Sequence, residues 1–174
     1  ALHGAIAAAL EQAGAPAIEA RLGDLSWHFY QSGVWDKALD YSRRAGERAQ
    51  ALYSPRAAAE YYTRAIVAAQ AQVAAETLQA LYYARAEAYA QLGEFDAARS
   101  DYEAALIAAQ ASGDRQAEWQ ALLGLGLLWA SRDYVQAGVF FQRALDLAPQ
   151  LTDTALVGHT LNRVGNWHMN AERP

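Results

Sequence analysis

One short pattern occurs three times in this chain, and it limits the possible fold more than any other feature. The pattern is A-x3-Y-x2-A or A-x3-F-x2-A, and its copies occupy residues 58–65, 98–105 and 137–144. The copies begin 40 and 39 residues apart. Such a near-constant period indicates a repeat array, in which each unit needs its neighbours in order to bury its apolar face.

The clearest unit covers residues 81–106, and it predicts two helices that pack against each other. Its first half repeats large and small apolar residues at the helical spacings of four and three, namely Tyr82, Ala86 and Tyr89. Gly93 can adopt the left-handed conformation that ends a helix, and Asp96 places negative charge at the start of the next one. We therefore expect a helical hairpin that turns at Gly93.

Composition and punctuation extend this prediction to the whole chain. Hydrophobic residues make up 53% of the 174 residues and only four prolines occur, a balance rich in alanine that favours helix. We predict a single all-α domain over 1–174, an α-solenoid of antiparallel helix pairs with about nine helices. The second helix is expected over 17–32. The expected pairs cover 1–32, 35–71, 74–111 and 114–148, and an unpaired helix covers 152–171.

Charge, cysteine content and hydropathy restrict the classes of partner. The net charge is −5 and no basic cluster exceeds Arg43 and Arg44, which argues against direct binding of nucleic acid. The chain has no cysteine, which excludes disulfides and agrees with a reducing compartment. The apolar run over 121–130 is about half as long as the roughly 20 residues of a membrane helix. We expect a cytoplasmic protein that binds neither nucleic acid nor a membrane.

The sequence contains no motif of a catalytic, cofactor or metal site. Walker-type and G-x-S-x-G motifs are absent, and the four histidines lack metal-ligand spacing. Gly124 and Gly126 lie inside an expected helix, where close helix packing explains them. Asp101 and Glu103 fit a solvated helix face better than acid–base catalysis. We therefore predict no catalytic, cofactor-binding or metal residue, and a protein that is not an enzyme.

The repeated residues resemble the tetratricopeptide repeat, or TPR. The best match consists of Tyr82, Ala86, Tyr89, Gly93, Phe95, Ala98, Tyr102 and Ala105. The period near 40 exceeds the common value of about 34, and Arg85 and Arg132 replace a usual core leucine and turn glycine. Longer repeats of this kind are similar to the MalT-like sensor region of bacterial signal-transduction ATPases and transcription regulators. Residues 41–66 and 161–167 strengthen that likeness.

The resemblance implies a right-handed superhelix whose first helices line a concave groove for a protein, a peptide or another domain. The groove is expected to be polar towards its N-terminal end and aromatic towards its C-terminal end. Alternatively, Trp119 and Trp129 pack against the first helix of the 74–111 pair and the helix over 152–171. The predicted groove residues are Arg43, Glu47, Gln50, Tyr83, Glu87, Gln91, Trp119, Leu122, Trp129, His159, Asn162, Asn166 and Met169.

These observations predict a non-catalytic scaffold that binds a protein or ligand, as the sensor or interaction region of a bacterial signalling ATPase or regulator. The alternative is a purely architectural or self-assembly segment. The chain starts without Met and stops at Pro174, so we expect a fragment of a longer multidomain protein. The apolar face of the last helix is then expected to associate with a second copy, through Leu161, Val164 and His168.

Overall fold

The computed structural model describes residues 2–12, 15–72, 75–151 and 154–171. These residues form ten α-helices and one 3₁₀ helix, and no strand occurs among them. The elements are α1 (Leu2–Glu11), α2 (Ala15–Ala20), α3 (Leu22–Ser32), α4 (Trp35–Ala51), α5 (Pro55–Ala71), α6 (Ala75–Leu92), α7 (Phe95–Ser112), α8 (Arg115–Ala130), α9 (Tyr134–Leu147), η1 (Ala148–Gln150) and α10 (Thr154–Ala171). The predicted all-α class is confirmed.

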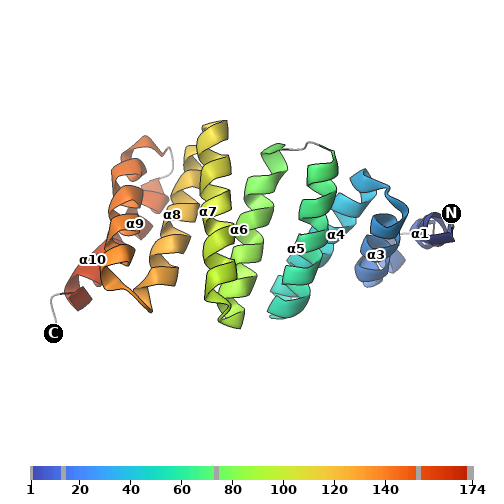
Figure 1. The fold of residues 1–174 in the computed structure, drawn as a ribbon, viewed down its shortest axis with the longest axis horizontal. Helices are drawn as coiled ribbons and strands as arrows, with labels where there is room; N and C mark the ends of the chain where they lie inside the picture. The colour runs from blue at the N-terminus through green and yellow to red at the C-terminus, as the bar shows by residue number, and fades with distance from the viewer. Residues whose placement is uncertain (1, 13–14, 73–74, 152–153, 172–174) are drawn as a thin grey trace.

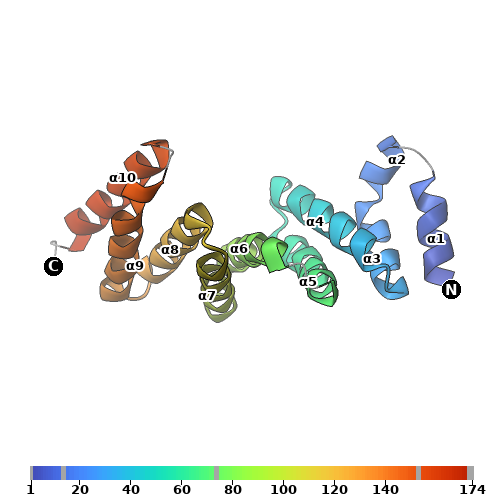
Figure 2. The same ribbon diagram turned by 90° about the horizontal axis from the view of Figure 1, so that it is seen from above.

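The helices from α3 onwards follow one another across the molecule, and each packs against the next (Figure 1). Seen from above, they form a shallow arc (Figure 2). Helices α4, α6, α8 and α10 lie along its inner side, and α5, α7 and α9 lie along its outer side. The predicted solenoid of helix pairs is therefore confirmed.

The helix expected over 17–32 is two helices, which raises the number from about nine to ten. Arg21 interrupts it with φ −120° and ψ 24°, and its backbone N–H bonds to the carbonyl of Ile18 at 2.9 Å. The interruption reorients the chain so that α3 buries Leu22, Leu25 and Phe29. Burial of these large side chains favours the break over one continuous helix.

Two kinds of turn join the later helices. Gly93 has φ +75° at the end of α6, which confirms the expected left-handed turn. The α8–α9 turn has no glycine, and Asp133 closes it instead, since its Oδ1 accepts from the N–H groups of Val135 and Gln136 at 2.9 and 3.0 Å. Arg132, beside this cap, lies over the ring of Phe95 with 4.0 Å to the centroid. A side-chain cap and a cation–π contact thus replace the usual glycine.

Glycines let the repeated aromatic rings reach the backbone of a facing helix. A Cβ atom on Gly46 would lie 2.7 Å from the Tyr62 ring. On α8, a Cβ on Gly124 would lie 2.5 Å from Tyr102. A Cβ on Gly126 would also lie 2.5 Å from the Phe141 ring. The sequence expectation of close helix packing at Gly124 and Gly126 is confirmed.

Arg85, the departure from a core leucine, holds three helices together. Its Nε and Nη2 atoms donate to both carboxylate oxygens of Asp101 on α7, at 2.6 and 2.8 Å. Its Nη1 donates to Thr63 on α5 at 3.0 Å. Asp101 is only 5% exposed, so the expectation of a solvated face is wrong for this residue. Its burial requires the charge of Arg85.

Candidate binding groove

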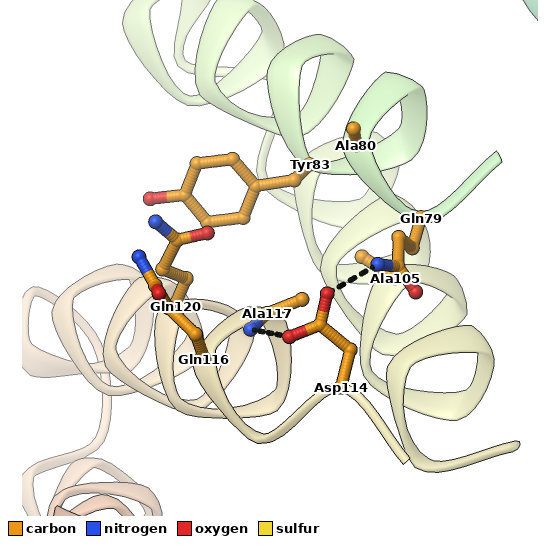
Figure 3. A pocket seen from close by; sticks show the side chains of 8 residues that line it. All are labelled: Gln79, Ala80, Tyr83, Ala105, Asp114, Gln116, Ala117 and Gln120. Atoms are coloured by element: carbon orange, nitrogen blue, oxygen red, sulfur yellow. Dashed lines mark hydrogen bonds between the residues drawn. The ribbon is translucent and has the colours of Figure 1, made fainter. Parts of the chain in front are cut away.

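Two pockets follow each other along the inner side of the arc, between α6 and α8. The first encloses about 270 Å³ and is shown in Figure 3. Its lining residues are Gln79, Ala80, Tyr83, Ala105, Asp114, Gln116, Ala117 and Gln120. The second encloses about 360 Å³, and its lining residues are Glu87, Ala90, Gln91, Tyr102, Gly124, Leu127, Leu128 and Ser131. We call the two together the α6–α8 groove.

Helical spacing places these side chains in one line. On α6, four polar residues stand four positions apart and therefore share one helix face, namely Gln79, Tyr83, Glu87 and Gln91. On α8, Gln116, Gln120 and Gly124 repeat the same spacing. The sequence prediction included Tyr83, Glu87 and Gln91, and the structure brings them into the α6–α8 groove.

Some of the polar side chains in the groove are held by the protein and others are free. Asp114 caps α8, where its Oδ1 accepts from the Ala117 N–H at 3.0 Å and its Oδ2 from Gln79 Nε2 at 2.8 Å. In Figure 3, Tyr83 and Gln120 point into the same space from opposite helices. The amides of Gln116 and Gln120 make no hydrogen bond to another residue of the described chain. They offer donors and acceptors to a ligand.

Glu87 lies at the centre of this groove in a half-buried position. Burial raises the pKa of Glu87, and hydrogen bonds from Tyr83 and from Gln50 on α4 partly oppose that rise. Burial, reinforced by the charge of Glu87, raises the pKa of Tyr83 to about 12. The Tyr83 and Tyr102 rings meet edge to face at 5.5 Å between centroids. The carboxylate therefore stands in a partly dehydrated, aromatic setting.

The predicted α4 residues contribute less to the groove than their neighbours on α6. Arg43 donates to Glu47 at 2.6 Å and so forms an ion pair within one helix. Gln50 accepts from the Tyr62 hydroxyl at 2.6 Å and donates to the Ala84 carbonyl at 3.4 Å. Gln50 thus joins α4, α5 and α6, and it also supports Glu87.

The aromatic half of the predicted groove is wrong. Trp119 is 5% exposed and Leu122 is 2% exposed, both in the core. The indole Nε1 of Trp119 donates to Thr160 Oγ1 on α10 at 2.6 Å. Trp129 packs edge to face against Phe95, with 5.0 Å between centroids. The contact of Trp119 with α10 follows the alternative that the sequence left open, whereas Trp129 packs on α7 instead of the helices expected there. In both cases a large ring gains more from burial than from exposure.

The predicted residues of α10 share one helix face by their spacing, but none of them lines the α6–α8 groove. Asn166 donates to Asn162 at 2.7 Å on an exposed face, and Met169 is 62% exposed. The side chain of His159 lies outside the described residues. In the predicted association face, Val164 is 6% exposed and belongs to the core, which corrects its assignment. Leu161 and His168 are exposed.

Sequence reasoning missed several groove residues. Gln79, Gln116 and Gln120 were overlooked, although the recurrence of polar residues every four positions on two successive first helices could have indicated them. It also missed a pocket of about 520 Å³ on the outer side, lined by Trp27, Tyr30, Arg64 and Tyr89 among others. That pocket joins residues of α3, α5 and α6, which no sequence spacing connects.

The described residues provide neither a metal-binding cluster nor a membrane-spanning helix. No group of three or more His, Asp or Glu side chains among them is placed to hold a metal ion. In the same ranges, no helix has the length and apolar character needed to cross a bilayer.

The structure belongs to the class of α-solenoids built from TPR-like helix pairs. Its defining features are the paired helices, the turns closed by a glycine or a side-chain cap, and the polar groove on the inner side. Comparison with solved structures agrees. BtubC (BKLC) from P. vanneervenii is similar over 95% of this chain and 78% of its own, with a TM-score of 0.67 and 21% identity. The Arabidopsis OM64 TPR domain is similar over 75% of this chain and 96% of its own, with a TM-score of 0.57 and 24% identity. The sequence matches no protein-family profile and no curated protein.

Proposed function

We propose that this chain is a protein-interaction scaffold that binds an extended peptide segment of a partner in the α6–α8 groove. The observation that carries the proposal is the line of polar side chains on facing helices, in which the amides of Gln116 and Gln120, beside the Tyr83 ring, make no hydrogen bond to another described residue. An amide side chain both donates and accepts, as the peptide backbone does. The TPR-like fold of the OM64 domain supports an interaction role as an analogy.

In its finer form, the proposal places the scaffold in the cytoplasm as the sensor or interaction region of a bacterial signalling ATPase or transcription regulator. Its support is the likeness of residues 41–66 and 161–167 to MalT-like repeats. The partner is then a protein, a peptide or another domain of the parent chain. The chain itself supplies no catalytic step in this role.

Peptide phage display on the immobilised chain tests the interaction proposal. We expect enriched peptides whose affinity falls at least tenfold in the variant Gln116→Ala/Gln120→Ala, since loss of two hydrogen bonds of about 1 kcal/mol each accounts for that factor. Gln136→Ala, an exposed glutamine on α9, is the matched control and should bind as the wild type does. Enriched peptides that bind the double variant unchanged, or no enrichment at all, would reject the proposal.

An architectural segment is the second candidate. It is favoured by the burial of Trp119 and Leu122, which shows that part of the expected groove is filled by the chain's own side chains. The open pockets between α6 and α8 argue against it as the complete function.

A further inference from the structure

Glu87 differs from the buried carboxylates Asp101 and Glu118, each of which pairs with an arginine. Asp101 is held by both nitrogen donors of Arg85 at 2.6 and 2.8 Å. Glu87 lies on the same helix as Arg85, two residues further on, and the neighbouring groups that lower its pKa, Tyr83 and Gln50, are neutral. Among the described residues, no Lys, Arg or His side chain forms an ion pair with Glu87. In this partly dehydrated setting, no cation of the described chain compensates its negative charge.

The arginines around the groove are already committed to other carboxylates. Arg43 pairs with Glu47 at 2.6 Å, and Arg115 pairs with Glu118 at 2.8 Å. The two pockets are lined by Glu87 and Asp114, and neither lining includes a Lys or Arg. The groove therefore carries negative charge towards any ligand that enters it.

The walls around Glu87 fit a long side chain with a cationic end. Leu127, Leu128 and the Tyr102 ring provide apolar surface along which a methylene stem can pack. Gln91 and Ser131 line the same pocket. They can accept hydrogen bonds from those N–H groups of the cationic end that do not bond to Glu87. A charge-assisted bond to a half-buried carboxylate is stronger than a neutral one.

We propose that the Glu87 pocket binds a basic side chain, arginine or lysine, of the peptide that occupies the α6–α8 groove. This inference rests on the proposed function and names the chemistry of its partner. The cation neutralises Glu87, its stem lies on Leu127, Leu128 and Tyr102, and the peptide backbone continues towards Gln120 and Gln116. The pocket thus selects a segment with a basic residue.

A titration with single amino-acid derivatives tests the pocket without a peptide. N-acetyl-arginine amide and N-acetyl-lysine amide are added to the ¹⁵N-labelled chain at pH 7.5, and N-acetyl-citrulline amide serves as the neutral isostere of arginine. We expect saturable shifts of backbone signals at 87–91 and 124–131 with a basic derivative and none with citrulline. In Glu87→Gln the dissociation constant should rise at least tenfold.

The matched control is Glu103→Gln, which removes an exposed carboxylate of α7 and should leave the titration unchanged. Equal shifts with citrulline, equal binding by Glu87→Gln, or no saturable shift with either basic derivative would overturn the inference. Failure of the two proposals can be told apart. If the selected peptides depend on Gln116 and Gln120 but share no basic residue, only the inference about the Glu87 pocket is rejected. If the arginine derivative binds at Glu87 but no peptide binder is found, only the proposed peptide scaffold is rejected.

Discussion

At the scale of single residues, the buried carboxylate of Asp101 and the half-buried carboxylate of Glu87 have opposite roles in this array. Asp101 is paired with Arg85 and holds α5, α6 and α7 together. Glu87 has no cation and faces the groove. Pairing makes a buried charge part of the structure, whereas an unpaired charge costs stability and remains available to a ligand.

Replacing Glu87 should therefore stabilise the protein in a pH-dependent manner. Because the folded-state pKa of Glu87 is raised above 4.5, the folded chain holds this proton more tightly than the unfolded chain, and stability falls as pH rises through that pKa. We expect Glu87→Gln to raise the free energy of unfolding in urea at pH 7 and to have no such effect at pH 4. An equal change at both values would contradict this assignment.

Breaking the Arg85–Asp101 pair should have the opposite effect. Arg85→Leu leaves Asp101 buried without a cation, and we expect the free energy of unfolding to fall by about 3 kcal/mol. Thr63 retains its bond to the Ala59 carbonyl at 2.8 Å, so the loss is assigned to Asp101. The double variant Arg85→Leu/Asp101→Leu should recover most of the loss. No recovery in urea unfolding would mean that the pair is not the cause.

At the scale of helices, the array is held together by aromatic rings that pack on bare backbone. Tyr102 of α7 reaches α8 where Gly124 has no side chain, and Tyr62 of α5 reaches α4 at Gly46. Each ring thus fixes how closely two helices approach. The same contact positions Tyr102 beside the groove, so that packing and the shape of the site are linked.

Two glycine-to-alanine variants separate helix propensity from this packing. A Cβ at Gly165 on α10 meets nothing within 4 Å, so Gly165→Ala should stabilise the chain by up to about 1 kcal/mol. At Gly124 the added Cβ would lie 2.5 Å from the Tyr102 ring, and displacement of that ring should cost about 1–3 kcal/mol. Thermal unfolding of both variants provides the comparison. If Gly124→Ala also stabilises, the ring does not depend on the missing Cβ.

At the scale of the whole molecule, each helix is stabilised by its neighbours in the row, as in other repeat arrays. Helix α10 packs on α9, where the Trp167 ring lies over Gly138, and it buries Val164 in the core. On α10, Leu161 is 55% exposed and Met169 is 62% exposed. This is less apolar surface than the sequence prediction assumed.

We still expect self-association through α10, but of low affinity, because two exposed apolar side chains bury little area. Sedimentation velocity over a wide concentration range should show a concentration-dependent dimer that Leu161→Glu abolishes. Val139→Glu replaces a residue that is 48% exposed on α9 and should leave the dimer intact. A monomer at every concentration would reject the association face.

The sequence by itself determined the helical class, the repeat and most turns, because these depend on local spacing. The resemblance to TPR repeats predicted that Tyr83, Glu87 and Gln91 face the groove, and their four-residue spacing gives them a common helix face. Only the tertiary structure decided which faces are covered. The indole N–H of Trp119 can be buried because it donates to Thr160, which lies 41 residues further on. The carboxylate of Asp101 can be buried because Arg85 reaches it from another helix. Contacts between distant residues depend on how successive helices pack, and local sequence spacing does not specify that packing.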